Sequence, residues 1–298
     1  MNNSIESNST AKHNFDELES VFRFMVFLIP FGLIILGMNA VALRVFLRER
    51  FRSKKSSYLI VNLTIADSLV GLTSVLLCVC LINLIKGSEG RLELDILRGL
   101  LFTIRLSAIA SLLSLSAIAV ERLIAVKYPF KLRLASSRHY FGAIFVVWIL
   151  AAPTPVIWML ERERIILNNG SRIFNQITEG ISLAIIALCY LCIWIKMAFF
   201  PEFNIDIQTN NCRTVKENKK LTITLFIITV ISIITWAPNG IKDLLLSDET
   251  QQQQMTLKDL LFLLPVLSNS IFNVIVYAFR MPDFRRELKK VFPVGRND

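Results

Sequence analysis

The chain has 298 residues, of which 54% are hydrophobic, and its mean hydropathy is +0.55. This composition excludes an ordinary soluble globular domain and is typical of a membrane protein. The formal net charge of +10 would suit a nucleic-acid partner, but the distribution of Lys and Arg has a different explanation.

Seven apolar stretches follow one another along the chain, and each is long enough to cross a bilayer. A hydrocarbon core about 30 Å thick needs roughly 20 apolar residues in a helix. The sequence therefore predicts an all-α bundle of seven transmembrane helices over residues 22–280, between an extracellular tail (1–21) and a cytoplasmic segment (281–298). The stretches span residues 22–47, 57–85, 99–126, 139–160, 174–200, 218–241 and 256–279.

The basic residues are divided unevenly between the two sides that this topology implies. With the amino terminus outside, the cytoplasmic segments 48–56, 127–138, 196–220 and 280–298 hold 20 Lys and Arg, whereas the extracellular segments hold 9. This is the positive-inside pattern of membrane proteins. Membrane topology and contact with anionic cytoplasmic lipid thus explain the basic surplus, and no nucleic-acid partner is expected.

The outer segments carry three acceptors for N-glycosylation, at Asn2, Asn8 and Asn169. None of the five cysteines lies in a predicted outer loop, so we expect no extracellular disulfide.

An amphipathic stretch follows the last span. Phe284, Leu288, Val291 and Phe292 fall on one side of a helix over 282–292, with basic residues opposite. This pattern predicts a short helix at the carboxyl end that lies on the inner membrane surface. A solvated tail is the alternative.

Polar residues inside the spans need an explanation, because a charge at bilayer depth costs roughly 2.5–3.5 kcal/mol. Asp67 lies in the middle of the second span. Hydroxyl and amide side chains in the third and seventh spans could join it: Ser107, Ser111, Ser268, Asn269, Ser270 and Asn273. Such a group could hold a sodium ion or water, or it could only bond helices together.

Two further features mark the third and sixth spans. The third ends in Glu121-Arg122, an acid and a base that can pair at the cytoplasmic end, although a snorkelling arginine would look the same. The sixth contains Trp236 and Pro238. Proline kinks a helix, which makes this point either a pivot or a static bend.

A mixed-charge cluster is expected in the outer half of the bundle, above Trp236. Arg105 comes from the third span and Glu179 from the fifth, and three residues follow the kink of the sixth: Asn239, Lys242 and Asp243. The cluster could bind a polar or zwitterionic ligand, or it could be an internal network of salt bridges.

Taken in order, these residues resemble the rhodopsin-like (class A) G protein-coupled receptors, over about residues 22–292. The motifs that carry the resemblance are Gly37-Met38-Asn39, Asn62-Leu63 with Ala66-Asp67, Glu121-Arg122-Leu123, Trp148, Thr235-Trp236-Ala237-Pro238 and Asn273-Val274-Ile275-Val276-Tyr277. The tail after Tyr277 looks most like that of adenosine- and melanocortin-type receptors.

The resemblance implies roles for the residues that match. It implies a sodium pocket made by Asp67, Ser111, Asn269, Ser270 and Asn273. It implies a cytoplasmic switch for G-protein coupling that comprises Glu121, Arg122, Tyr190, Lys220, Pro238 and Tyr277, with Trp236 as the ligand-responsive pivot.

Departures from the family pattern carry expectations of their own. The outer end of the third span has Leu97, Arg98 and Gly99 where a disulfide cysteine is usual, so the loop 161–173 is expected to be untethered. Asn218 stands where an acid often holds the third-span arginine, so we expect noticeable basal activity.

The resemblance implies a plasma-membrane receptor that binds an extracellular ligand and activates a heterotrimeric G protein as helix six opens. Amine receptors of the family place an aspartate at this part of the third span, and its retinal-binding members use a lysine in the seventh. Residues 103–106 contain no acid and residues 259–279 contain no lysine, so the expected ligand is a small polar molecule or a peptide. The alternative class is a seven-helix transporter or channel, although no internal repeat supports it. The spans lack a nucleophile and base for an enzyme.

Overall fold

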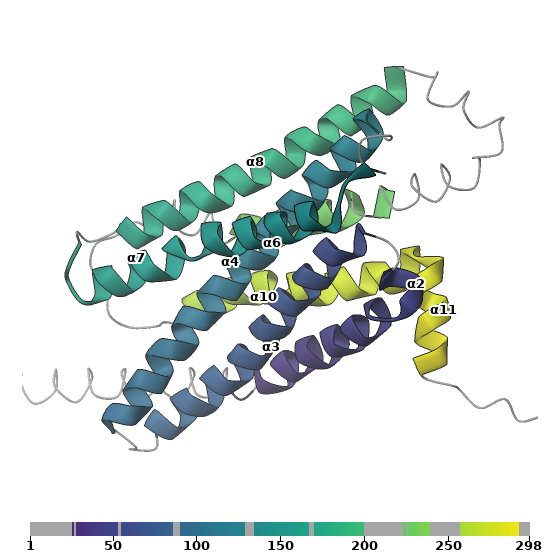
Figure 1. The fold of residues 1–298 in the computed structure, drawn as a ribbon. Coiled ribbons are helices and arrows are strands. Elements are labelled where there is room, and N and C mark those ends of the chain that lie inside the picture. The colour runs from purple at the N-terminus through teal and green to yellow at the C-terminus, as the bar shows by residue number, and fades with distance from the viewer. Residues whose placement is uncertain are drawn as a thin grey trace, which may run out of the picture.

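The computed structural model describes residues 26, 28–52, 55–85, 90–128, 134–166, 170–199, 223–224, 226–238 and 257–291. In these residues the chain is a bundle of helices without strands, as predicted (Figure 1). The helices are Leu28–Phe46, α2 (Glu49–Arg52), α3 (Ser57–Ile85), α4 (Arg91–Lys127), α6 (Ser137–Ala151), α7 (Pro153–Arg162), α8 (Gly170–Phe199), Phe226–Pro238, α10 (Leu257–Arg280) and α11 (Pro282–Val291).

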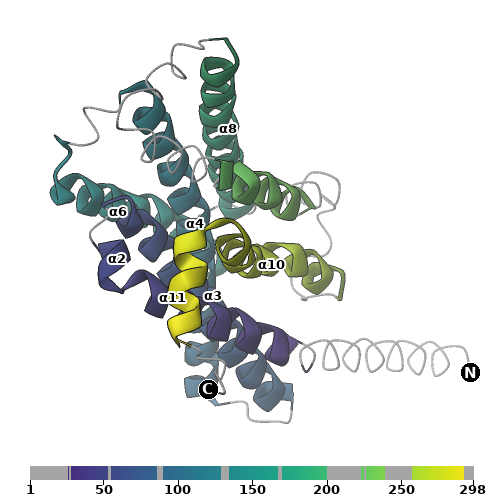
Figure 2. The same cartoon turned by 90° about the vertical axis from the view of Figure 1, so that its right-hand side faces the viewer.

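Each of the seven predicted spans has a helix in the structure. In the part of the chain that is described, five helices are long and apolar enough to cross a membrane, with α6 and α7 counted as one. Helix Phe226–Pro238 covers the centre of the sixth span, and α10 provides the seventh. The expected surface helix is α11, which is bent by 100° from the end of α10 (Figure 2).

The predicted boundaries are wrong at three places. Helix α4 begins at Arg91 rather than at residue 99, and α8 begins at Gly170 rather than at residue 174. The prediction ended the spans at charged residues, but charge alone does not stop a helix, and an i,i+3 ion pair joins Asp95 to Arg98 within α4. The fourth span is divided at Ala152, because Pro153 has no N–H to continue the hydrogen bonds of α6.

Helix α4 lies at the centre of the bundle and packs against α3, α6, α7 and α8. Its buried residues include four serines, Ser107, Ser111, Ser114 and Ser116, rather than large apolar side chains alone. Small hydroxyl residues let helices approach closely and bond across the interface, which is the usual way to join helices in lipid. The most enclosed helix of the fold therefore carries hydroxyl side chains that can take part in a polar site between helices.

The first helix approaches α3 closely at Gly32 and Gly71. A Cβ atom on Gly71 would lie 2.7 Å from the backbone nitrogen of Leu36 and 3.1 Å from the carbonyl oxygen of Gly32. Backbone atoms at these distances cannot move aside as a side chain can, so this contact requires glycine.

We expect Gly71→Ala to destabilise the bundle by about 1–3 kcal/mol, because the added methyl group separates two packed helices. The matched control is Gly142→Ala, since a Cβ atom at Gly142 meets nothing within 4 Å. The midpoint of thermal unfolding of the purified protein should fall for the first variant and stay or rise for the second. Equal midpoints for the two variants would contradict the contact.

Candidate functional site

Asp67 of α3 is completely buried and is held by side chains of two other helices, α4 and α10. Its Oδ1 accepts hydrogen bonds from Ser111 Oγ of α4 (2.7 Å) and from Ser270 Oγ of α10 (2.8 Å). Its Oδ2 accepts one from Asn273 Nδ2 (2.8 Å). The structure therefore brings together four of the five residues that the sequence assigned to a sodium pocket.

The fifth residue, Asn269, points to a different partner. Its Oδ1 accepts hydrogen bonds from Ser232 Oγ (2.6 Å) and Thr235 Oγ1 (3.5 Å), both on helix 226–238. Asn269 thus links the sixth and seventh helices next to the Asp67 cluster, and no hydrogen bond joins it to Asp67 in the described chain. Ser232 could not be recognised from the sequence, because a serine on an apolar helix face is common.

The chemistry around Asp67 suits a small hard cation. Its three hydrogen-bond donors are neutral, and no Lys, Arg or His side chain of the described residues forms an ion pair with it. A buried carboxylate without a compensating charge is costly. Hydroxyl and amide groups can rotate to present oxygen, which is the ligand that hard cations prefer. With a single carboxylate, the donor set fits a monovalent ion such as sodium.

A second polar group joins α3, α4 and α6 through the motif residues Asn62 and Trp148. Asn62 Nδ2 donates to Ser114 Oγ (2.8 Å), and Trp148 Nε1 donates to Asn62 Oδ1 (2.9 Å). These bonds satisfy a buried amide and an indole at once, so this group fixes helix positions.

The expected pair at the end of α4 is present. Arg122 is only 3% exposed, and its Nε donates to Glu121 Oε2 at 2.6 Å. Oxygen Oε1 of Glu121 accepts from Ser56 Oγ (2.7 Å), just before α3, and from Tyr140 OH (3.4 Å) of α6. The sequence analysis missed Ser56 and Tyr140, because their spacing does not show that they meet Glu121. The carboxylate is thus shared by an arginine and two hydroxyls.

Two further switch residues, Tyr190 and Tyr277, are buried near the same end of the bundle. Tyr277 is 1% exposed and meets the ring of Phe46 edge-on, with the ring centres 5.2 Å apart. Tyr190 on α8 meets Phe226 in the same way at 5.4 Å. Tyr190 therefore packs against the sixth helix, to which Phe226 belongs, so movement of that helix would change the surroundings of Tyr190.

Trp236 and Pro238 lie at the outer end of helix 226–238. Trp236 is 4% exposed, and its Nε1 has no hydrogen-bond partner among the described atoms. Pro238 is the last described residue of the helix, so a bend beyond it is outside the described part of the chain.

In the outer half, Arg105 stacks on an aromatic ring. Its guanidinium carbon lies 4.7 Å from the ring centre of Trp158 on α7, and that of Arg162 lies 5.8 Å from the same ring. Glu179 is buried and accepts a hydrogen bond of 2.5 Å from Asn175 Nδ2. The sequence analysis missed Trp158, although its spacing of four residues from Arg162 in a helix was a usable signal.

A profile of the family described as "7 transmembrane receptor (rhodopsin family)" matches residues 38–277. The chain belongs to this family. It is therefore a receptor that crosses the membrane several times, and it is not an enzyme. The matched range includes Asp67, Arg122, Trp236 and Tyr277.

Individual relatives agree with this assignment. Melatonin receptor type 1A of Phodopus sungorus is 24% identical over 294 residues, which cover 90% of this chain and 79% of the relative. Galanin receptor 2b of Danio rerio is 27% identical over 296 residues, which cover 92% of this chain and 75% of the relative. The crystal structure of squid rhodopsin has the same fold, with a TM-score of 0.70 at 16% identity over 91% of this chain and 85% of that one. These relatives do not support the adenosine- or melanocortin-like interpretation of the tail, which stays a prediction.

Several predicted residues of this receptor lie outside the described residues, and their roles stay predictions. These are Asn239, Lys242 and Asp243 of the ligand cluster, Lys220 and Asn218 of the inner end, and the glycosylation acceptors Asn2, Asn8 and Asn169.

Proposed function

We propose that this receptor binds an extracellular ligand in the outer half of its bundle and activates a heterotrimeric G protein at the inner end. The observation that carries the proposal is the buried Glu121–Arg122 pair, held by Ser56 and Tyr140. A cation that is 3% exposed can meet a protein partner only after its surroundings open. The excess of Lys and Arg on this side supports a cytoplasmic position, with the amino terminus outside the cell and the receptor in the plasma membrane.

The mechanism that fits is a shift between closed and open arrangements. Helix 226–238 touches the seventh helix through Ser232 and Asn269, and it touches α8 through Phe226 and Tyr190. Movement of this helix about Pro238 would break these contacts and open a cavity beside Arg122. An outer ligand drives the change by binding more tightly to the open arrangement, and the G protein in turn raises the affinity for the ligand.

The ligand is proposed to be a small polar molecule or a peptide that meets Arg105, Trp158 and Glu179. The guanidinium of Arg105, which lies over the indole ring of Trp158, suits a carboxylate or phosphate by its charge and by paired hydrogen bonds. A melatonin receptor and a galanin receptor match this chain at similar identity, so the comparisons favour neither ligand. Asn239, Lys242 and Asp243 are proposed to complete the pocket.

A sodium ion is proposed at Asp67 as a modulator of the same equilibrium. Asp67, Ser111, Ser270 and Asn273 would hold it, and Asn269 would connect that site to the sixth helix through Ser232. The support is a buried carboxylate whose neighbours are neutral oxygen-bearing groups.

A ligand library tested in cells that express the full receptor with separate G-protein subtypes would examine this function. At least one compound should activate one subtype in a dose-dependent way. Arg122→Gln, brought to equal surface expression, should lose that response, because the amide has no charge to offer the partner. Ion flux that follows expression without any G-protein signal would contradict the proposal and favour a channel.

We expect Trp158→Leu to weaken agonist potency by about twofold to about thirtyfold, because a cation–π contact contributes about 0.5 kcal/mol when exposed and about 2 kcal/mol when desolvated. The change removes the ring on which Arg105 lies. The matched control is Trp194→Leu on α8, where the tryptophan is 62% exposed to the outside of the bundle. Half-maximal agonist concentrations from the assay above measure the effect. A loss of the same size in the control would remove the assignment.

A further inference from the structure

An apolar groove lies between the first helix, α10 and α11, beside the ring contact of Tyr277 with Phe284. Its volume is about 310 Å³, and all the residues that line it are apolar, among them Val41, Ile275, Phe279 and Leu288. Gly37 leaves the groove open on one wall, because a Cβ atom there would meet nothing within 4 Å. Phe279 is 73% exposed at the end of a membrane-spanning helix, so this side of the bundle faces lipid.

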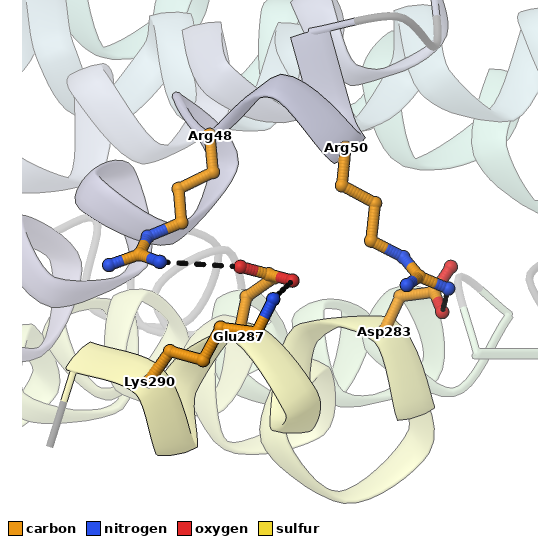
Figure 3. A network of polar contacts seen from close by, with 5 residues as sticks. All are labelled: Arg48, Arg50, Asp283, Glu287 and Lys290. Carbon is orange, nitrogen blue, oxygen red and sulfur yellow. Dashed lines mark hydrogen bonds and ion pairs between the residues drawn. The ribbon is translucent and has the colours of Figure 1, made fainter. Parts of the chain in front are cut away.

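Helix α11 forms one end of the groove and is held in place by ion pairs. Arg48 Nη1 lies 3.5 Å from Glu287 Oε2, and Lys290 Nζ lies 2.7 Å from Glu287 Oε1 (Figure 3). Arg50 Nη2 lies 2.5 Å from Asp283 Oδ1. The hydrogen bond from Lys290 lowers the pKa of Glu287 from its ordinary value, so the acid is charged at neutral pH. We call these contacts the α11 clasp.

The α11 clasp pairs the two acids of α11 with Arg48, Arg50 and Lys290, and three other cations of α11 lie outside it. Arg285, Arg286 and Lys289 are exposed, and none of them has an acidic partner in the part of the chain that the structure describes. Successive residues of a helix are about 100° apart. Arg285 and Lys289 therefore flank the apolar face that holds Phe284 and Leu288, on the side opposite the clasp. Arg285 and Lys289, which we call the basic rim, border the face of α11 that lines the groove.

We propose that the groove and the basic rim bind one anionic phospholipid of the cytoplasmic leaflet, with an acyl chain in the groove and the phosphate on Arg285 and Lys289. The apolar walls of the groove and the exposed cations of the basic rim match a molecule that has a long acyl chain and a negative headgroup. Anionic lipids of the cytoplasmic leaflet attract Lys and Arg at this surface. A free lipid is the proposed source of the acyl chain, since residues 278–298 contain no cysteine for a thioester-linked one. The choice of leaflet rests on the proposed function, which puts α11 in the cytosol.

Native mass spectrometry of the purified full receptor tests the site, with phosphatidylserine and phosphatidylcholine in equal excess. The wild-type receptor should carry mainly one phosphatidylserine. The triple variant Arg285→Gln, Arg286→Gln and Lys289→Gln should lower this adduct by about tenfold, because each cation near the membrane surface contributes to the attraction. Gly37→Leu should lower it to a similar degree, because the side chain fills the groove.

The matched controls are Arg138→Gln, which removes an exposed cation at the start of α6, and Gly142→Leu, at a glycine that likewise has no atom within 4 Å of a Cβ. Both should keep the wild-type adduct, and all variants should keep the thermal midpoint of the wild type. Equal binding of the two phospholipids, displacement of both by cholesterol, or an unchanged adduct in Gly37→Leu would overturn the site. Because the assay contains neither agonist nor G protein, a failed ligand screen would leave this result standing.

Discussion

Replacing Asp67 with Asn should abolish the response of the receptor to sodium while the bundle stays folded. The variant keeps the shape of the side chain and one carbonyl oxygen for Ser111 and Ser270, but it removes the only charge that could attract a cation to the cluster. Its new NH2 group faces the NH2 group of Asn273, which costs one hydrogen bond, or about 1–3 kcal/mol for the buried donor. A modest loss of stability is therefore expected as well.

The measurement is the midpoint of thermal unfolding in sodium chloride compared with N-methylglucamine chloride of equal ionic strength. Sodium at ten times its Kd would stabilise the wild type by about 1.4 kcal/mol, and Asp67→Asn should show no difference between the two salts. Ser268→Ala is the matched control: Ser268 lies on α10 with Ser270 and Asn273 but donates to the carbonyl of Pro265 rather than to Asp67. A full sodium shift in Asp67→Asn would exclude this site.

The sequence was sufficient for features that recur at fixed positions in a family. Asp67, Ser111, Ser270 and Asn273 lie on three helices far apart in the chain, and only the resemblance could place them together before the structure did. Periodicity and composition alone showed that each span contains polar groups. They could not show which groups meet, because one helix face can turn toward several neighbours.

Some contacts between individual side chains were beyond the sequence. Ser56 precedes α3 and Tyr140 lies in the first turn of α6, where serine and aromatic residues are common and carry no signal of their own. Their partners depend on how the helices are rotated and shifted, which hydrophobic periodicity does not determine. The early start of α4 has the same origin: Arg91, Glu93 and Asp95 marked the end of the apolar stretch, although a helix can continue into water.

Glu121→Gln should raise basal signalling more than any other single change at the inner end. The carboxylate pairs with Arg122, which is 3% exposed, and removing one partner of a buried ion pair costs about 3–5 kcal/mol because the other charge is left uncompensated. The open arrangement lets Arg122 meet water or a G protein, so the variant raises the free energy of the closed arrangement more than that of the open one. Each 1.4 kcal/mol of this difference shifts the balance about tenfold.

Nucleotide exchange on a purified G protein, with the receptor in nanodiscs and no agonist, measures this shift. Ser56→Ala and Tyr140→Phe are the matched controls, because each removes one hydrogen bond to Glu121 and keeps its charge. A hydrogen bond to a charged group contributes about 1.5–3 kcal/mol, so the effect of Ser56→Ala should be smaller than that of Glu121→Gln, and Tyr140→Phe smaller still at its longer distance of 3.4 Å. Basal exchange at the wild-type level in Glu121→Gln would mean that the pair does not hold the receptor closed.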